Sequence, residues 1–174
     1  MTHNQLFDNL HPDFLAANQL VYKQSGFITS KPIKELESEE YGACVFEINN
    51  RSVKFRVAKI TPKKVGQFVT LWKRIGLGPI MPYDIADPID LFVVSVRNGD
   101  LFGQFVFPKA VLDAQGILSR KGQEGKRAMR VYPPWDKPQN RQAQLSQYWQ
   151  LKYFFEISHN STVDQERVQR LFSD

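Results

Sequence analysis

Sulfur and imidazole ligands are scarce in this chain of 174 residues. Cys44 is its only cysteine, which excludes an internal disulfide and a zinc site built on cysteines. The histidines, His3, His11 and His159, all lie near the ends of the chain, so a histidine-based metal centre is not expected either. The composition therefore predicts a protein without a transition-metal cofactor.

Long apolar runs are also missing. No stretch approaches the roughly 20 apolar residues that cross a bilayer as a helix. The first residues do not combine a basic segment with an apolar one, as a signal peptide would. We expect a cytoplasmic protein that does not bind membranes.

Acidic residues are absent from one long segment. Between Ile48 and Tyr83 there are eight basic residues and no acidic one. A second basic patch, Ser119–Arg130, has Glu124 as its single acid. Acid is concentrated instead in "KELESEE", residues 34–40. With a net charge of +5 and a pI near 9.3, this asymmetry favours a polyanionic partner.

The periodicity of the apolar residues predicts one layered domain over residues 1–174. Its N-terminal helix is expected at about 6–24 and its C-terminal helix at about 163–172. The core of the domain should lie between them, at about 40–157. Two hairpins are expected in the core. Residues 43–59 alternate on both sides of Asn49-Asn50, and residues 89–96 and 101–108 flank Asn98-Gly99. A short helix should follow at about 109–117.

Helical spacing of apolar residues suggests further helices. Thr61-Pro62 is typical of a helix start. The pattern predicts a helix over residues 61–75 whose basic face is exposed to solvent. A strand at 127–135 would then follow the short helix in a right-handed parallel crossover. A long helix is expected at 139–157. The predicted class is α/β, bordering on α+β, with a central mixed sheet flanked by helices.

Five segments carry a resemblance to a known family. They are "EYGACVFEINNRSVKFRVAKITPKKVGQFVTLWKR", "DPIDLFVVSV", "GQFVFPKAVL", "GKRAMRVYPPWD" and "QAQLSQYWQLKYF". From about Glu40 to Phe155 the chain resembles the MepB family of bacterial proteins. The resemblance implies a restriction-endonuclease-like fold with a mixed sheet, and it implies no particular activity.

Nucleases of that fold place Pro-Asp at the head of one hairpin strand and Asp/Glu-x-Lys on the next, so that two carboxylates hold Mg²⁺. Here Asp90 stands at the first position, but Gln104 and Val106 replace the acid and the lysine. The pattern predicts a degenerate catalytic site with Asp90 and Gln104 as its remnants and Asp90 as the candidate metal ligand. Alternatively, Asp90 accepts hydrogen bonds from backbone N–H groups at the start of a strand, and Gln104 is a polar side chain of the sheet whose hydrogen bonds are all made within the protein.

We therefore expect nucleic-acid binding on a nuclease-like scaffold. The expected contacts to phosphates and bases come from cations and from two aromatic residues: Lys54, Arg56, Lys59, Lys63, Lys64, Lys73, Arg74, Arg127, Arg130, Tyr132 and Trp135. One alternative is a Mg²⁺-dependent nuclease or phosphodiesterase that uses Asp90 and Gln104. Another is a nucleotide or small-anion binder, although the chain has no glycine-rich phosphate loop.

Overall fold

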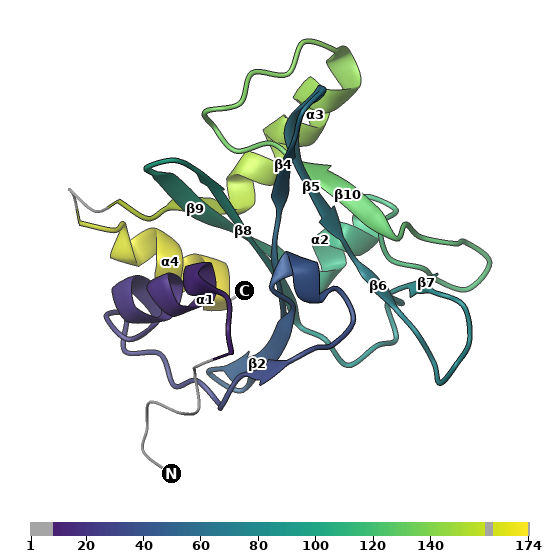
Figure 1. Cartoon of the computed structure of the whole chain (residues 1–174), viewed down its shortest axis with the longest axis horizontal. Helices are drawn as coiled ribbons and strands as arrows, with labels where there is room; N and C mark the ends of the chain where they lie inside the picture. Colours follow the sequence, from purple (N-terminus) through teal and green to yellow (C-terminus); the bar gives the residue numbers. More distant parts are fainter. Residues whose placement is uncertain (1–8, 159–161, 174) are drawn as a thin grey trace.

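A six-stranded sheet lies at the centre of the computed structural model, which describes residues 9–158 and 162–173 (Figure 1). In spatial order its strands are β1 (Ile33–Lys34), β2 (Cys44–Ile48), β3 (Arg51–Val57), β8 (Leu91–Asn98), β9 (Leu101–Pro108) and β11 (Phe154–Glu156). β3 and β8 pair in parallel, whereas the other neighbours are antiparallel. The predicted class, a mixed sheet with helices on its faces, is confirmed.

Both predicted hairpins are present in this sheet. β2 and β3 are joined at Asn49 and Asn50, whose φ angles are 49° and 65°. Positive φ at both central residues is the geometry that a two-residue turn between twisted strands requires. β8 and β9 meet at Gly99, with φ at 61°. The local turn chemistry therefore fixed both hairpins.

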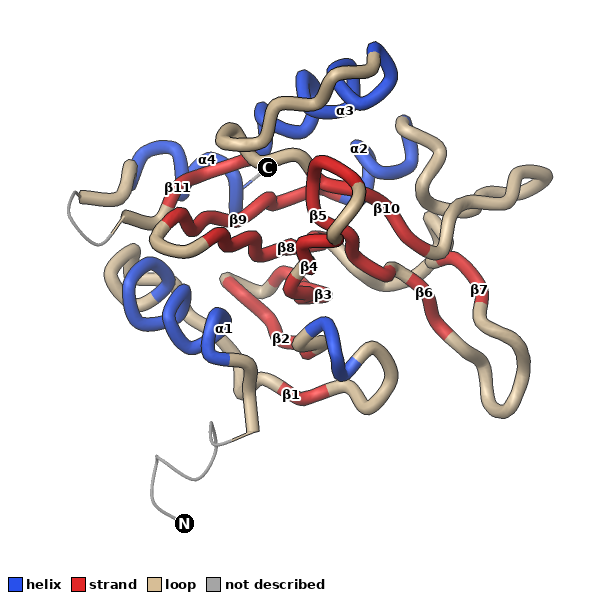
Figure 2. The backbone as a smooth tube through the Cα atoms, turned by 45° about the horizontal axis from the view of Figure 1, so that its top comes forward, coloured by secondary structure: helices blue, strands red, loops and turns tan. Residues whose placement is uncertain are grey.

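The two faces of the sheet pack against different layers (Figure 2). Leu91 and Val93 of β8 point into one core, with Phe14, Tyr22 and Phe172 from the helices. Phe92, Val94 and Val96 point into the other, which contains residues of β5, β9 and β10. This alternation explains why β8 reads as a continuous apolar run: both of its faces are buried.

Helices α1 (Pro12–Ala17) and α4 (Gln165–Ser173) cover the first face. A π-helical turn at Asn18–Tyr22 continues α1, so the predicted N-terminal helix is present from Pro12 onward. Its expected start at residues 6–8 lies outside the described residues. The predicted C-terminal helix is confirmed by α4. No helix within 9–158 or 162–173 is long and apolar enough to cross a membrane.

The helix expected over residues 61–75 is wrong. These residues form strands: β4 (Lys59–Thr61), β5 (Lys64–Thr70) and β6 (Trp72–Lys73), which pairs with β7 (Met81–Pro82). Thr61-Pro62 is the tip of the β4–β5 hairpin rather than a helix cap. Gln67, Val69 and Leu71 are buried on one side with period two. The φ angle of Gly66 is 86°, which lies outside the range of a right-handed α-helix.

The prediction of a parallel crossover is also wrong. β10 (Ala128–Val131) pairs antiparallel with β5, and with β4 it completes a separate three-stranded sheet in the order β10, β5, β4. The short helix that precedes it, α2 (Lys109–Ala114), was predicted correctly. The long helix expected at 139–157 ends early: α3 (Arg141–Gln150) gives way to a 3-10 turn and then to β11 on the sheet edge.

Candidate nucleic-acid interface

A groove runs between the β4–β5 hairpin, β10 and α3. Its volume is about 760 Å³. Four cationic side chains line it and no carboxylate does: Lys63, Lys64, Lys126 and Arg130. The other polar lining is neutral: Gln115, Gln139, Asn140, Gln142, Ser146 and Gln150. We call this cavity the basic groove.

Two close contacts fix the hairpin side of the groove. Gly66 has no Cβ, and one added there would lie 2.6 Å from Cε1 of Tyr132, so β5 approaches this ring closely. Arg130 donates from Nη2 to Oγ1 of Thr61 at 2.7 Å and from Nη1 to the Gly66 carbonyl at 3.3 Å. Since both acceptors are neutral, the guanidinium keeps its charge unneutralised in the groove.

The helix side is fixed by the amide side chains of Gln150 and Asn140. The buried Gln150 accepts from the Tyr132 backbone N–H at 2.8 Å and donates to the Arg130 carbonyl at 2.9 Å, which ties the end of α3 to β10. At the other end, Oδ1 of Asn140 caps α3 by accepting from the Ala143 N–H at 2.8 Å. Hydrogen bonds and close contacts therefore hold both sides of the groove in place.

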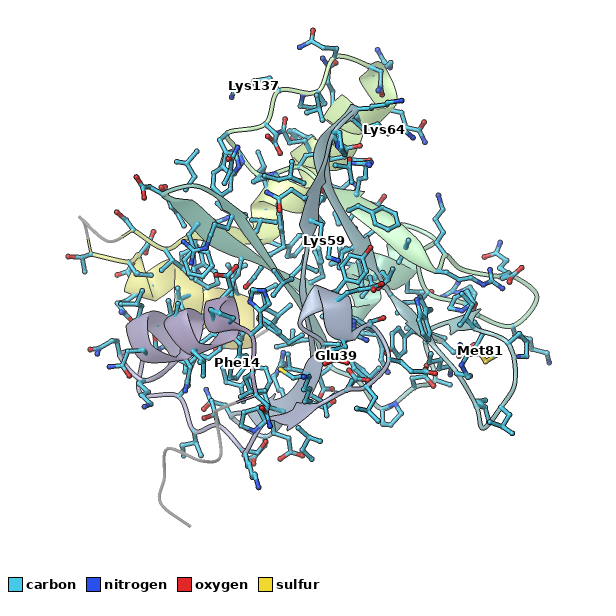
Figure 3. All side chains as sticks on the ribbon, in the orientation of Figure 1. Phe14, Glu39, Lys59, Lys64, Met81 and Lys137 are labelled. Carbon is cyan, nitrogen blue, oxygen red and sulfur yellow. The ribbon has the colours of Figure 1, made fainter. Side chains whose placement is uncertain are left out.

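Three lysines of the basic groove have no partner in the described part of the chain. Among the described residues, the side chains of Lys63, Lys64 and Lys126 form no ion pair or hydrogen bond. Figure 3 shows Lys64 at the outer end of the hairpin. Of the predicted cations, the structure therefore places Lys63, Lys64 and Arg130 in the groove without a carboxylate partner, and Lys126 joins them there.

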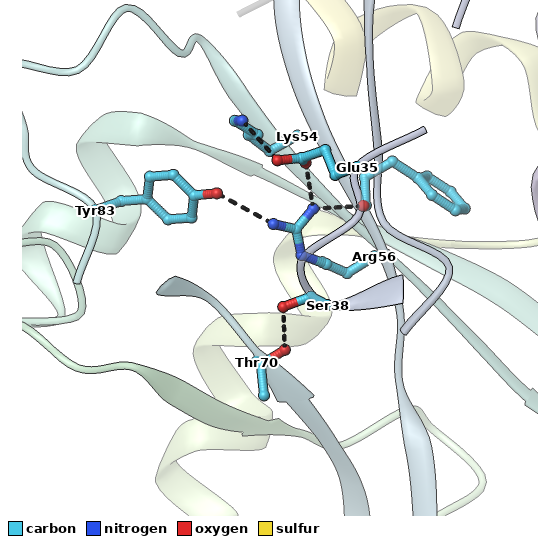
Figure 4. A network of polar contacts seen from close by, with 7 residues as sticks. Glu35, Ser38, Lys54, Arg56, Thr70 and Tyr83 are labelled. Carbon is cyan, nitrogen blue, oxygen red and sulfur yellow. Dashed lines mark hydrogen bonds and ion pairs between the residues drawn. The ribbon is translucent and has the colours of Figure 1, made fainter. Parts of the chain in front are cut away.

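Arg56 is not part of that surface, which corrects the prediction. Its side chain is 1% exposed, and it donates to Oε1 of Glu35 at 2.8 Å and to the Tyr83 hydroxyl at 3.1 Å (Figure 4). Lys54 contacts the other oxygen of Glu35 at 3.1 Å. We call these four residues the Glu35 cluster. Burial raises the pKa of the Tyr83 hydroxyl, and the neighbouring Arg56 charge opposes that rise. Arg56 is structural.

Three other predicted phosphate contacts are neutralised within the protein. Lys73 bridges both oxygens of Asp87 at 2.6 and 2.7 Å. Arg74 pairs with Glu37 at 2.7 Å and Arg127 with Glu124 at 2.6 Å. Their charges are already balanced, and none of the three lines the basic groove.

Lys59 and the two predicted stacking residues also lie differently from expectation. The ammonium of Lys59 stands over the Tyr41 ring, 4.6 Å from its centroid. Trp135 packs edge-on against Phe154 with 5.9 Å between centroids, and its buried Nε1 has no hydrogen-bond partner among the residues that the structure describes. Tyr132 lines the groove, but the backbone of Gly66 covers part of its ring. Neither ring offers two free faces for a base.

Asp90 and Gln104 do not converge. Oδ2 of Asp90 accepts from the backbone N–H of Ser52 at 2.8 Å, so Asp90 caps the entrance of β8. Gln104 is fully buried: it accepts from the Tyr22 hydroxyl at 2.7 Å and donates to Oγ of Ser95 at 2.8 Å. Asp90 lies opposite Lys109, five residues along the chain from Gln104. That is about 17 Å at about 3.4 Å per residue.

The two residues therefore cannot share a metal ion. Among the described residues, no group of three His, Cys, Asp or Glu side chains is close enough to hold one. The structure instead matches the alternative reading of each residue, a strand-entrance cap and a satisfied core amide.

A second cavity, of about 530 Å³, lies over the outer side of β2 and β3. Its walls include Val45, Phe46 and Ile89, and two of its lysines, Lys54 and Lys73, are the ones paired to carboxylates. Because its wall is apolar and these lysines are neutralised, it suits a polyanion much less well than the basic groove does.

Sequence reasoning missed part of the groove. Lys126 belongs to the basic patch Ser119–Arg130 but was not singled out. The amides of α3 carried no signal, because glutamine and asparagine on a helix surface are ordinary solvated residues. What distinguishes Gln150 is that it is buried and spans to β10, which only the tertiary structure reveals.

Comparisons with known proteins give a consistent family. The profile of the MepB-like family matches residues 35–156. A crystal structure of MepB is similar with a TM-score of 0.74 and 30% identity, over 87% of this chain and 99% of that one. A bacterial homing endonuclease is similar at a TM-score of 0.42 and 20% identity, over 78% and 87% of the two chains. That likeness is too remote to bear on activity. The search of curated proteins gives no match.

Proposed function

The chain belongs to the MepB-like family, and from the geometry of the basic groove we propose that it binds nucleic acid there through the phosphate backbone. One observation supports this most strongly. The cations of the groove have no carboxylate partner in the lining, whereas those at Arg56, Lys73, Arg74 and Arg127 are paired. The fold thus pairs these four cations with carboxylates and leaves the concave surface of the groove positive.

Such a surface fits a polyanion better than a single small anion. Lys63 and Lys64 lie on the hairpin, while Lys126 and Arg130 lie on or next to β10, so the charges follow the groove rather than meet at one point. A row of cations neutralises successive phosphates, and the released counterions drive binding. The neutral amides along α3 supply donors for phosphate and sugar oxygens.

The experiment is a salt titration of binding, followed by fluorescence anisotropy of labelled oligonucleotides. With four groove cations in contact with phosphates, the slope of log K against log[salt] is expected to be about −3.6 for duplex DNA. Affinity should fall by about two orders of magnitude between about 50 and 200 mM salt. No binding at low salt, or binding indifferent to salt, would contradict the proposal.

We expect binding without efficient cleavage, because Asp90 and Gln104 lie about 17 Å apart along the sheet. The check is incubation of a labelled oligonucleotide with the protein and Mg²⁺ or Mn²⁺. Product that appears with the metal and disappears in Asp90→Ala would establish the nuclease alternative instead.

A further inference from the structure

We propose that the partner of the basic groove is double-stranded DNA, with the tip of the β4–β5 hairpin inserted in the major groove. This inference rests on the proposed function and adds the substrate class. The hairpin tip, residues 60–66, would enter the duplex, and α3 would face the phosphate backbone of one strand from the other side of the basic groove.

The hairpin projects beyond the rest of its sheet (Figures 1 and 2). β10 pairs with β5 only as far out as Gln67, which faces Val131. Beyond that pair, β4 and β5 continue as a two-stranded ribbon through Thr61 opposite Lys64. Three residues of β5 at about 3.3 Å each extend about 10 Å beyond this last pair with β10. The major groove of B-DNA is about 8.5 Å deep and about 12 Å wide, and it admits a two-stranded ribbon.

The side chains of the tip suit that position. Lys63 and Lys64 carry unpaired charges at its end, within reach of the phosphates that border a groove. Ile60 and Val65 are 57% and 45% exposed, although apolar β-branched side chains are normally covered. In a major groove, such side chains contact thymine methyl groups and base edges.

Contacts with β10 also hold the hairpin tip in one conformation before DNA binds. Arg130 bonds both sides of the hairpin, at Thr61 and at Gly66, and the Tyr132 ring packs against Gly66. A register shift between Ile60 and Thr61 sets the twist of the outermost residues. A ribbon that is ordered before binding loses less conformational entropy when it binds.

Single-stranded nucleic acid fits this site less well. Proteins that bind single strands without sequence preference stack bases on exposed aromatic rings. Here Trp149 packs on Phe107 with 5.4 Å between centroids, and Trp135 packs on Phe154. Tyr148 is exposed, but the ammonium of Lys152 stands 4.8 Å from its ring centroid. Apart from the exposed Tyr148, whose ring Lys152 approaches, these aromatic side chains pack within the fold, so the contacts offered by the groove are mainly those that a duplex backbone uses.

Duplex RNA is disfavoured for a different reason. The major groove of an A-form helix is deep and narrow, so protein elements do not enter it. The hairpin would then have to lie outside the helix. We expect binding to RNA duplexes to be weaker than binding to DNA duplexes of the same sequence and charge.

The test compares four labelled probes at one salt concentration: a DNA duplex, one of its single strands, the RNA duplex of the same sequence, and the DNA duplex with glucosylated 5-hydroxymethylcytosine in place of cytosine. The last probe fills the major groove without adding charge. We expect the plain DNA duplex to bind about tenfold more tightly than each of the other three.

The double variant Lys63→Gln/Lys64→Gln should bind the plain duplex about tenfold to a hundredfold more weakly. A matched control, Lys23→Gln/Arg170→Gln, removes the same charge from α4 and the end of the N-terminal helical segment, and it should bind as the unmodified protein does. Equal affinity for the plain and the glucosylated duplex, or tighter binding of the single strand, overturns the hairpin insertion and leaves the proposed function standing. Failure of all four probes to bind overturns both.

Discussion

The Glu35 cluster and the basic groove both draw on cations that cluster in the sequence, and the fold uses them in opposite ways. In the cluster, Arg56 is 1% exposed and shares one carboxylate with Lys54. In the groove, Lys63 and Lys64 are exposed and no carboxylate lines the cavity. Charge density along a chain therefore does not reveal which cations are available. That depends on where distant acids are brought by the fold.

The position of the acids explains the difference. Glu35 and Glu37 belong to the acidic segment at residues 34–40, which the β1–β2 connection lays beside β3 and β6. Asp87 reaches Lys73 in the same region. Within residues 9–158 and 162–173, no carboxylate lines the groove beside the tip of the β4–β5 hairpin. One part of the basic stretch thus became structural, while the other remained free to bind.

The largest effect should come from breaking the Glu35 cluster. Glu35→Ala removes the carboxylate partner of the buried Arg56, and an uncompensated buried charge costs about 3–5 kcal/mol. Urea denaturation should show this loss in the free energy of unfolding. Glu37→Ala, which removes the exposed partner of Arg74, is the control and should cost less than about 1 kcal/mol. Equal costs would mean that the buried cluster is not structural.

Charge reversal in the groove should give the next largest effect, on binding rather than stability. Lys63→Glu/Lys64→Glu removes two phosphate contacts, each contributing about one order of magnitude at about 50 mM salt. We expect affinity for duplex DNA to fall at least about a hundredfold while the unfolding free energy changes by less than about 0.5 kcal/mol. Lys23→Glu/Arg170→Glu provides the same charge change elsewhere. If that control loses as much affinity, net charge and not the groove governs binding.

Gly66→Ala should affect both properties moderately. The new methyl group would meet the Tyr132 ring, and φ at 86° is unfavourable for alanine, so we expect a loss of about 1–3 kcal/mol and a weaker hairpin contact with DNA. Gly99→Ala tests the backbone contribution alone: φ is 61° there, but nothing lies within 4 Å. Its cost should be about 1 kcal/mol, with no change in binding. Identical behaviour of the two variants in both assays would contradict the contact with Tyr132.

The smallest effect concerns pH. Burial lowers the pKa of His11; the charge of Asp13 opposes this, and that of Arg97 adds to it. The neutral ring accepts the Asp13 N–H at Nδ1 and so caps α1. Since the unfolded chain binds the proton more readily, stability should decrease as pH falls through about 6.5, the ordinary imidazole value. Thermal unfolding of His11→Asn, which keeps a capping acceptor, should lack this component. A pH dependence unchanged by that substitution would exclude His11 as its source.

The sequence predicted those parts of the fold whose conformation is determined locally. Asn49-Asn50 and Gly99 specified their hairpins because positive φ angles leave few alternatives, although Asn98 itself is the last residue of β8. The segment 61–75 misled because its apolar residues fit helical spacing as well as alternation. The deciding facts were tertiary, namely the close approach of Gly66 to Tyr132 and the pairing of β5 with β10.

The site was predictable to the same limited extent. Of the predicted contacts, the structure places Lys63, Lys64 and Arg130 in the groove, and the basic patches that contain them are visible in the sequence. Arg56 and Lys73 could not be told apart from them, because their partners Glu35 and Asp87 stand 21 and 14 residues away along the chain. Pairing at that separation leaves no periodic signal.

The most direct test of the central claim, that only the unpaired cations of the groove contact nucleic acid, is the slope of log K against log[salt] for duplex DNA in two double variants. Lys63→Gln/Lys64→Gln should make that slope shallower by about 1.8. Lys73→Gln/Arg74→Gln, which removes two paired cations, should leave the slope as it is in the unmodified protein. A slope that changes equally in both variants, or only in the second, would contradict the account.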